Sequence, residues 1–477
     1  MSGCSAGDAP RYIRKVWEVA NREFNWEFHQ STVSETTFFS GKDEIIFWQN
    51  ERGAMYEVAQ SVKHLNHAAQ NWLRGKPNWG RQGVCVSQMG ALCPTVYTGE
   101  IYDCNACALV PNDAAHLAAL WCFCSSGSLA HEVRKLDRSL KVTPKSLIKI
   151  PFDIEYWKDA ALRTFPDGLP EPWSSDPTQW LFHGHPGSSD AGTALHVALA
   201  RLLGYQWPAE TDHALRLSDQ ARAWVAKSAE LPAGDNDGLV GVPPVAGEKS
   251  LADRLRAYLA ASFDGEWSDA LEGRLVSEAD DLIDKKVARD GSLESWVRDR
   301  AFRQHCALFG QRPFLWHITD GLKDGFSVFV HYHRFDQANL RKLTYTLLGD
   351  WLARAKAENN ALRYEKGREL QQTLEKVLEG EKPYDIFVRW KTLAQQPLGW
   401  EPDLDDGVRQ NIRPFIKAGV LTHDLSKILK DKDRGNDVAS APWYPVFKGE
   451  RRNDHHTTLA EKHAASEAAG GREQATK

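Results

Sequence analysis

Residues 83–124 read GVCVSQMGALCPTVYTGEIYDCNACALVPNDAAHLAALWCFC, and this stretch indicates both strands and a helix within one short region. Gly83–Ser87 and residues 95–97 are rich in β-formers, with glycine and proline between them, as expected for two short strands. Asn112 can then cap a helix, with Asp113 in its first turn. The apolar positions of that helix, spaced at i, i+3, i+4 and i+7, are Leu117, Leu120, Trp121 and Cys124. The stretch therefore predicts a domain that mixes α and β structure.

The residues on either side extend the same mixed pattern. Residues 44–48 are typical of a strand, residues 128–138 of a helix, and residues 146–150 of a further strand. Asp153 then opens another helix. We therefore predict that residues 1–165 form one α+β domain.

The rest of the chain divides by composition. Residues 166–190 are rich in Pro, Gly, Ser and Asp, and we interpret them as a linker or a packed arm. Residues 191–310 follow a mostly helical pattern. Residues 311–447 begin with β-like sequence, continue with two long helices over 336–380, and end irregularly. The hydrophilic residues 448–477 are predicted to form a disordered tail. The fold class expected for the whole chain is α+β.

Length and charge exclude several classes of protein. At 477 residues the chain exceeds the size of a single hydrophobic core, so two or three domains are expected. The 59 basic and 64 acidic residues give a net charge of -5, which excludes a uniformly basic nucleic-acid coat. The first 150 residues nevertheless contain 16 basic and 14 acidic residues, a net charge of +2. A site for a polyanion should therefore be local and should lie in this first part.

Two further features bear on the cellular compartment. No apolar run approaches the roughly 20 residues that a membrane-spanning helix needs. Eight cysteines in a chain of this length are not typical of a disulfide framework. We therefore expect a cytoplasmic protein that does not act at a membrane.

The first candidate site is the loop NWLRGKPNWGRQG at residues 71–83, in which basic and aromatic residues are interleaved. Cations in such a loop can bind phosphates, and indole rings can stack on bases or sugars. Amide side chains at its end and beyond it could read the edges of bases. The candidate DNA-contacting residues are Arg74, Lys76, Trp79, Arg81, Gln82 and Gln88. The alternative is a Gly-rich surface turn whose tryptophans anchor it in the core.

The second candidate is the segment 134–149, which contains six cations and one acid in sixteen residues. Such a density of positive charge is typical of a surface that follows a phosphate backbone. The residues that we expect to contact DNA are Arg134, Lys135, Arg138 and Lys141. The alternative is a solvated helix face.

Motifs for metal or nucleophilic chemistry are weak. The cysteines between residues 104 and 124 fit no usual zinc spacing. His331 and His333 would share one face of a strand, which suits a divalent metal, and a metal-dependent nuclease is therefore an alternative function. The sequence contains no phosphate-binding P-loop and no HExxH motif. We therefore predict no catalytic residue, metal site or cofactor site in this chain.

Blocks of sequence along nearly the whole chain resemble one family. The blocks are residues 3–17 (GCSAGDAPRYIRKVW), 72–90, 105–110, 149–153, 170–173, 176–186, 312–318, 399–404, 407–415 and 453–456. They resemble the C-terminal, non-catalytic half of large adenine-specific DNA methyltransferases of phage-defence systems. These are the PglX-like enzymes of the phage-growth-limitation, BREX and DISARM type, related to type IIG restriction-modification proteins.

The resemblance implies that the chain is the target-recognition part of a site-specific adenine-N6 DNA methyltransferase. Methyltransferase domains of this family bind S-adenosylmethionine with a Gly-rich loop and hold the flipped adenine with an Asn-Pro-Pro-Tyr-type motif. This chain contains no Asn-Pro dipeptide, and the resemblance begins at residue 3, so we expect the catalytic half to be supplied elsewhere. The expected partners are double-stranded DNA, a catalytic domain or subunit that binds S-adenosylmethionine, and other defence-system subunits. A non-catalytic interaction subunit of a defence complex is a further alternative.

Overall fold

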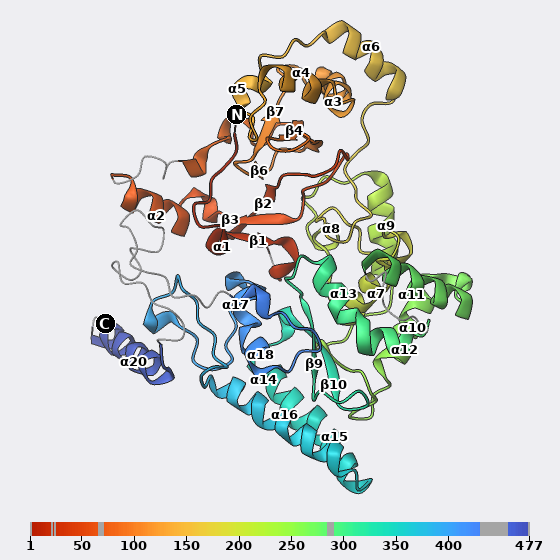
Figure 1. Cartoon of the computed structure of the whole chain (residues 1–477), viewed down its shortest axis with the longest axis vertical. Helices are drawn as coiled ribbons and strands as arrows, with labels where there is room; N and C mark the ends of the chain where they lie inside the picture. The colour runs from red at the N-terminus through yellow and green to blue at the C-terminus, as the bar shows by residue number, and fades with distance from the viewer. Residues whose placement is uncertain are drawn as a thin grey trace.

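Small sheets surrounded by helices make up the protein. The computed structural model describes residues 2–20, 22, 25–64, 71–283, 291–429 and 457–475. Helices account for 49% of the chain and strands for 11% (Figure 1). The predicted α+β class is therefore confirmed. One hydrophobic core, extending along the chain from Val16 to Leu425, joins most of these layers.

Two small sheets form the N-terminal part of the protein. In the first, β1 (Ile13–Lys15), β3 (Glu44–Phe47), β2 (Trp26–Gln30) and β6 (Ile101–Tyr102) are neighbours in that order. In the second, β5 (Pro94–Tyr97), β4 (Gly83–Ser87) and β7 (Ala106–Leu109) form an antiparallel sheet in that order. The strands predicted from the sequence in these places are confirmed.

One helix packs on the second sheet and others pack around that helix. α3 (Leu117–Ser125) lies against β4 and β5, α4 (Ser128–Leu136) and α6 (Ile154–Thr164) pack on α3, and α5 (Pro144–Leu147) packs on α4, while α2 (Ala54–Val62) follows the first three strands. Asp153 caps α6 as predicted, since its side chain accepts a hydrogen bond from the Tyr156 amide. The turn that leads into α3 is capped by Asp113 rather than by the expected Asn112.

The strand predicted at residues 146–150 is wrong. The Thr143 hydroxyl accepts a hydrogen bond from the Ser146 amide, and Pro144 occupies the first turn, so this segment starts a short helix instead. The β-branched residues Ile148 and Ile150 suggested a strand, but Thr143 and Pro144, which precede them, determine the local structure.

The segment 166–190 is a packed arm, and a helical region follows it. Trp180, Leu181 and Phe182 are buried in the main core, which a free linker would not allow. The helices that follow are α7 (Ala194–Leu202), α8 (Pro208–Thr211), α9 (Asp219–Ala229), α10 (Leu251–Ser262), α11 (Asp269–Ile283), α12 (Leu293–Ser295) and α13 (Ala301–Leu308). The helical pattern predicted for residues 191–310 is thus confirmed.

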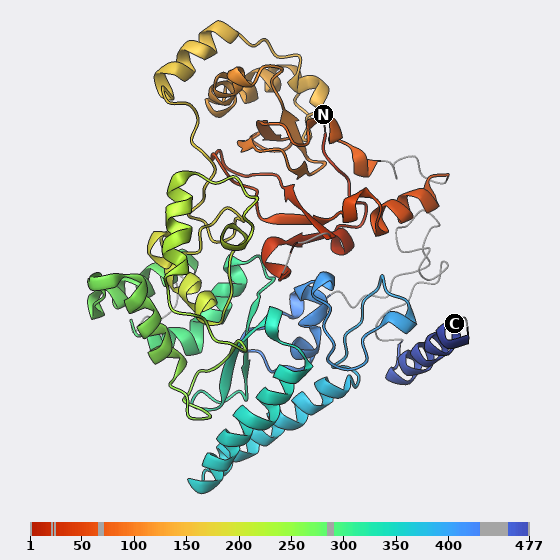
Figure 2. The ribbon, with the colours of Figure 1, turned by 180° about the vertical axis from the view of Figure 1, so that it is seen from behind.

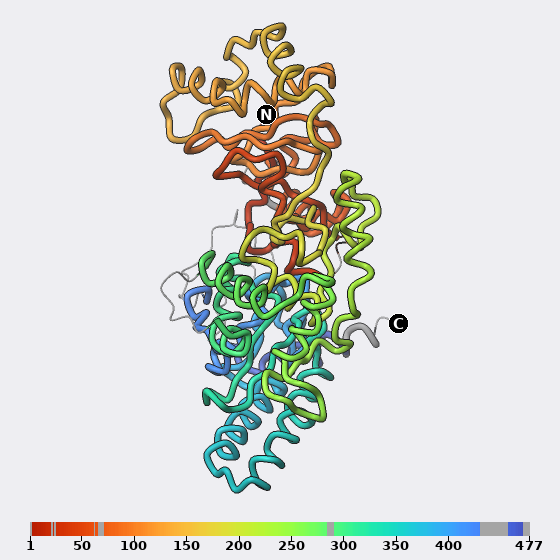
Figure 3. Tube along the Cα trace, turned by 90° about the vertical axis from the view of Figure 1, so that its right-hand side faces the viewer, coloured from red at the N-terminus to blue at the C-terminus, as the bar shows by residue number. Residues whose placement is uncertain are grey.

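A third sheet and a helical hairpin form the other end of the protein. β8 (Leu239–Gly241), β10 (Ser327–His331) and β9 (Leu315–Thr319) are antiparallel neighbours in that order. α14 (Gln337–Arg341) continues through the helical turn Lys342–Leu347 into α15 (Leu348–Ala357), which packs against α16 (Ala361–Glu379). Figures 2 and 3 show an elongated molecule, with the N-terminal sheets at one end and the α15–α16 hairpin at the other.

The last described residues correct the expectation of a disordered tail. α17 (Val408–Asn411) and α18 (Arg413–Ala418) complete the body of the protein, and residues 459–475 form the helix α20 (Leu459–Ala475). The Lys462 ammonium is buried and donates to Asp385 (2.7 Å) and to the Ile386 carbonyl (2.6 Å). A hydrophilic composition suggested disorder, but this buried ion pair fixes the helix to the body. Residues 448–456 and 476–477 of the expected tail lie outside the described residues.

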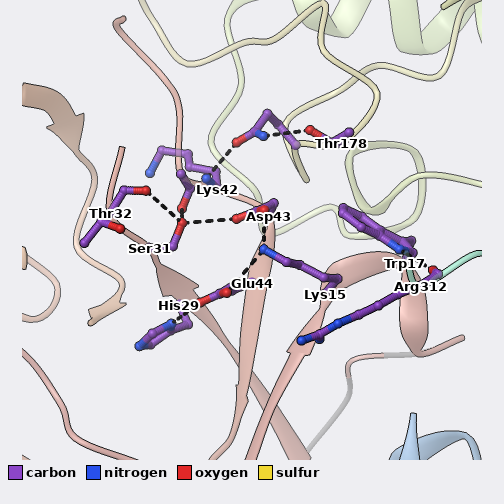
Figure 4. Close-up of polar contacts among 12 residues, drawn as sticks. Lys15, Trp17, His29, Ser31, Thr32, Lys42, Asp43, Glu44, Thr178 and Arg312 are labelled. Carbon is purple, nitrogen blue, oxygen red and sulfur yellow. Dashed lines mark hydrogen bonds and ion pairs between the residues drawn. The ribbon is translucent and has the colours of Figure 1, made fainter. Parts of the chain in front are cut away.

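Polar contacts tie the first sheet to distant parts of the chain (Figure 4). The Lys15 ammonium bridges Asp43 (2.5 Å) and Glu44 (3.2 Å) on the neighbouring β3 edge. The Trp17 indole donates to the Arg312 carbonyl (2.9 Å), and the Lys42 amide donates to the Gln179 side chain (2.7 Å). The N-terminal sheet is therefore bound both to the arm and to the region before β9.

Candidate functional site

The loop 71–83 presents its cations to solvent but not its tryptophans. Arg74, Lys76 and Arg81 are exposed, as is Gln82. Trp79 is half-buried, its indole nitrogen is enclosed, and its ring packs edge-on against Trp48 with centroids 5.2 Å apart. The other tryptophan of the loop is fully buried. The tryptophans therefore act as core anchors, which is the alternative that the sequence left open, and the cations of the loop remain exposed to solvent.

A glycine fixes the turn that displays these cations. Gly75 has a φ of +88°, in the left-handed region, and a Cβ at this position would lie 2.8 Å from the Tyr102 ring. Tyr102 is buried and receives a hydrogen bond from the Asn78 amide (3.2 Å). Gly75 lies between Arg74 and Arg81, the first and last cations of the loop. Its contact with Tyr102 therefore holds this part of the loop against the sheet.

Gln88 cannot contact DNA, and its prediction as a base-reading residue is wrong. Its side chain is 1% exposed, and its amide donates to the Ala106 carbonyl (2.9 Å) and to the Ser2 hydroxyl (3.1 Å). The residue follows β4 directly and completes the pairing with the segment before β7. From the sequence alone, the Gln88 side chain could have pointed toward solvent or toward the core. Only the structure shows that it points toward the core.

A substitution tests this structural role. Gln88→Ala should lower the free energy of unfolding by about 1–3 kcal/mol, because the Ala106 carbonyl loses its buried donor. DNA affinity should not change. Urea denaturation and DNA titration of the same preparation measure the two quantities. A weakened DNA affinity with unchanged stability would contradict this assignment.

The second basic segment spans the end of α4 and the loop that follows. Arg134 donates to the carbonyls of Ser139 (2.6 Å) and Gly90 (2.8 Å), which ties the helix to the turn after β4. Lys135 pairs with Glu132 (2.6 Å), which fits the alternative of a solvated helix face. Arg138 is exposed and has no hydrogen-bond or ion-pair partner within the described part of the chain.

The two basic segments meet at the turn between β6 and β7. The Lys141 ammonium donates to the Asn105 side chain (2.7 Å) and to the Cys104 carbonyl (3.2 Å). On the other side of this turn, Gly75, which directly follows Arg74, packs against the ring of Tyr102, two residues before Cys104. Burial and Asp103 raise the pKa of the Cys104 thiol above its ordinary value. Residues separated by more than sixty positions along the chain therefore form one cationic surface, which we call the Cys104 surface.

The cations of this region differ in how far they are already neutralised. Lys76 pairs with Glu51 (2.5 Å) and Lys135 with Glu132, so both have lost part of their attraction for phosphates. Among the described residues, the following cations have no carboxylate partner: Arg74, Arg81, Arg134, Arg138, Lys141, Lys145 and Lys149. Phosphate binding should therefore depend on this second set.

The histidine pair does not form a metal centre with the residues around it. His333 donates through Nε2 to the Trp17 carbonyl (2.9 Å), and the two imidazole centroids lie 5.0 Å apart. The described residues contain no group of three or more His, Cys, Asp or Glu side chains that could hold a metal ion. Burial lowers the pKa of His333 to about 4 and that of His331 well below its ordinary value. Both histidines line a cavity of about 600 Å³ that no sequence pattern indicated.

Comparison with known proteins adds no relative. No protein-family model matches the chain, and a search of curated proteins finds no match. The resemblance drawn from the sequence blocks therefore stays a prediction. In the part of the chain that the structure describes, no helix is both long enough and apolar enough to cross a membrane.

Proposed function

We propose that this chain is the DNA-binding, target-recognition part of an adenine-N6 DNA methyltransferase of a restriction-modification or phage-defence system. The observation that carries the DNA-binding proposal is the Cys104 surface, where two separate basic segments meet. Arg74, Lys141 and Arg138 would each bind a backbone phosphate, and Gln82, which is exposed just before β4, would reach a base edge. The methyltransferase identity rests on the sequence resemblance.

The chemistry would be divided between this chain and its partner. Phosphate contacts by the Cys104 surface would fix the position of the duplex, and a catalytic domain or subunit would bind S-adenosylmethionine and the flipped adenine. The sequence has no Asn-Pro-Pro-Tyr-type motif to hold that adenine itself. Nothing in the histidine pair favours the metal-dependent nuclease, because the described part of the chain offers it no third ligand.

The salt dependence of DNA binding tests the proposal. Each phosphate contact contributes about 0.9 to the slope of log K against log salt concentration. The double variant Arg74→Ala/Arg81→Ala should therefore reduce the magnitude of this slope by about 1.8 and weaken binding at every salt concentration. Fluorescence anisotropy with a labelled duplex, measured at several salt concentrations with the full chain, gives both values.

Two control variants make the result specific. Arg222→Ala/Arg274→Ala removes two exposed arginines from α9 and α11 and should leave the slope unchanged. Lys76→Ala should have a smaller effect than either arginine, because Glu51 already neutralises this lysine. An unchanged slope in the Arg74/Arg81 variant would remove the loop from the interface and would contradict the proposed two-segment surface.

A further inference from the structure

An apolar groove of about 710 Å³ opens at the surface of the N-terminal part of the protein, where the end of β7 meets the helices α3, α5 and α6. Side chains of the main core form its floor, and these are Phe123, Leu129 and Leu147. Its walls come from residues 109–111 and from the apolar side chains of the segment 148–154. An apolar hollow that faces solvent is typical of an interaction site.

Ile148 is the most exposed part of this groove, with 72% of its surface open to solvent. It directly follows α5, whose helical turn starts at the Thr143 cap. The turn places Lys145 three positions before Ile148 and on the same face, and Lys149 comes immediately after it. The local structure therefore holds a large apolar side chain in water beside two cations. Contact with a partner would remove this apolar surface from water.

The cations beside Ile148 are not neutralised. Lys145 and Lys149 are exposed, and neither pairs with a carboxylate within the part of the chain that the structure describes. Arg81 adds a third cation at the rim, because its guanidinium donates to the Pro111 carbonyl (3.3 Å). A partner that covers the groove should therefore carry acidic groups around its apolar surface. A second copy docked face to face would instead bring the same lysines together.

The acids near the groove do not cancel this charge. Asp113 accepts a hydrogen bond from the Ala115 amide (2.9 Å), and Asp153 accepts one from the Tyr156 amide (3.1 Å). Both carboxylates therefore cap the starts of helical turns, where the free backbone amides carry partial positive charge. The lysines at α5 have no such compensation, and this side of the groove stays positive.

The edge of the second sheet indicates which kind of segment fits. β7 is an edge strand, but the Ala108 carbonyl already accepts a hydrogen bond from the Asn78 amide (3.1 Å), and Ser2 forms a bridge with Cys107. These contacts occupy the edge to which a partner strand would add. A helix makes its own backbone hydrogen bonds and needs only apolar contacts from the groove. The groove therefore suits a helix better than an extended peptide.

We propose that this groove binds an amphipathic helix of a partner protein. Its apolar face would pack on Ile148 and Phe152, and acidic side chains beside that face would meet Lys145 and Lys149. The proposal does not rest on DNA binding by the chain. Because the two lysines also belong to the cations that are available to phosphates, the test is made in the absence of DNA.

Designed peptides added to the full chain test this proposal. The probes are fluorescein-labelled helical peptides of about 15 residues, with leucine, phenylalanine or methionine at positions i, i+3, i+4 and i+7. One set carries glutamate at the positions that flank the apolar face, and a matched set carries lysine there. At least one acidic peptide should bind at least tenfold more tightly than its lysine counterpart. Equal affinities, or no binding of any peptide, would overturn the proposal.

Two variants locate the binding and test its charge dependence. Ile148→Asp should weaken binding of the acidic peptide at least tenfold and leave the melting temperature unchanged, because the side chain is exposed. Lys145→Glu/Lys149→Glu should reverse the preference, so that the lysine peptide binds more tightly. The matched controls lie at exposed positions of the α15–α16 hairpin, and Leu362→Asp and Lys356→Glu/Lys376→Glu should change neither affinity. An unchanged preference in the double lysine variant would contradict the proposed orientation of the acidic side chains and overturn the proposal.

Vesicles separate a protein partner from a membrane surface. The chain should bind vesicles that contain phosphatidylserine no more tightly than vesicles of phosphatidylcholine alone. Binding to the phosphatidylserine vesicles that is lost in Ile148→Asp, without a preference for acidic peptides, would show that a membrane covers the groove, and the proposal would fail.

Discussion

Replacing Glu18 with alanine is expected to lower the free energy of unfolding by about 3–5 kcal/mol, the usual cost of removing one partner of a buried ion pair. The Glu18 side chain is buried, and its carboxylate accepts hydrogen bonds from Arg312 (2.6 Å), from the Lys15 amide (2.8 Å) and from the Val408 amide (3.1 Å). These three donors come from the start, the middle and the end of the chain. One carboxylate therefore joins segments that are separated by almost the whole sequence.

Glu18→Ala should destabilise the protein because the charges of Arg14 and Arg312 would remain in the site. Arg14 is only 3% exposed and lies beside Glu18, and this burial lowers the pKa of its guanidinium. Burial alone would raise the pKa of Glu18, but Arg312 and Arg14 hold it below its ordinary value. Without the carboxylate, Arg14 and Arg312 would lose the acid that lies between them, and only Asp406 on one side and Asp43 and Glu44 on the other would still act on their charges.

Urea denaturation at neutral pH measures this loss. Glu18→Gln keeps the shape and one acceptor oxygen, so its loss should be smaller than that of Glu18→Ala but still above 1 kcal/mol. Glu155→Ala is the matched control, because Glu155 forms only an exposed pair with Lys158 (3.3 Å), and its removal should cost less than about 0.5 kcal/mol. A loss of under 1 kcal/mol in Glu18→Ala would show that the three segments are held together by packing alone.

Elements with strong local signals could be predicted from the sequence. The strands at β3, β4 and β5 and the helix α6 follow from β-rich runs and an N-cap. The contacts of Glu18 could not be predicted, because Arg312 and Val408 lie hundreds of positions away and no periodic pattern links them. The same holds for α20, whose hydrophilic sequence conceals one lysine that becomes buried against Asp385.

In the candidate interface, too, some features could be predicted from the local sequence and others depend on long-range contacts. The cations of both basic segments were visible in the sequence, because charge density is a local property. That Lys141 and Arg74 would lie on the two sides of one turn depends on the pairing of β4 with β7, which brings the two segments together. The inward orientation of Gln88 and the packing of Trp79 on Trp48 depend on the same sheet. Long-range pairing thus determined which candidates reach the surface.

Acid should unfold this protein well above the pH at which its carboxylates titrate, because many of its histidines are buried and neutral. Burial lowers the pKa of His183, His185, His196 and His333 to about 4, that of His317 to about 3, and those of His305 and His331 well below the ordinary value. In the unfolded chain each imidazole would have a pKa of about 6.5. At a pH between these two pKa values, the imidazoles are protonated in the unfolded state but neutral in the folded state.

The sign of the effect follows directly. Stability is complete above pH 6.5 and is lost as the pH falls toward 4, by about 1.4 kcal/mol per pH unit for each such histidine. Because a typical protein has only about 5–15 kcal/mol of stability, we expect unfolding before pH 5 is reached. Urea midpoints measured at several pH values between 7.5 and 5.5 give the slope and thus the number of protons taken up on unfolding.

A single substitution tests whether buried histidines cause this slope. His196 is completely buried between Trp296 and His305, and burial lowers its pKa to about 4 although the neighbouring Gln304 side chain acts to raise it. His196→Leu should therefore reduce the proton uptake on unfolding by about one. His131→Leu, at an exposed position, should leave the slope unchanged. A flat stability profile down to pH 5.5 would contradict the argument, since folded and unfolded chains would then bind protons equally.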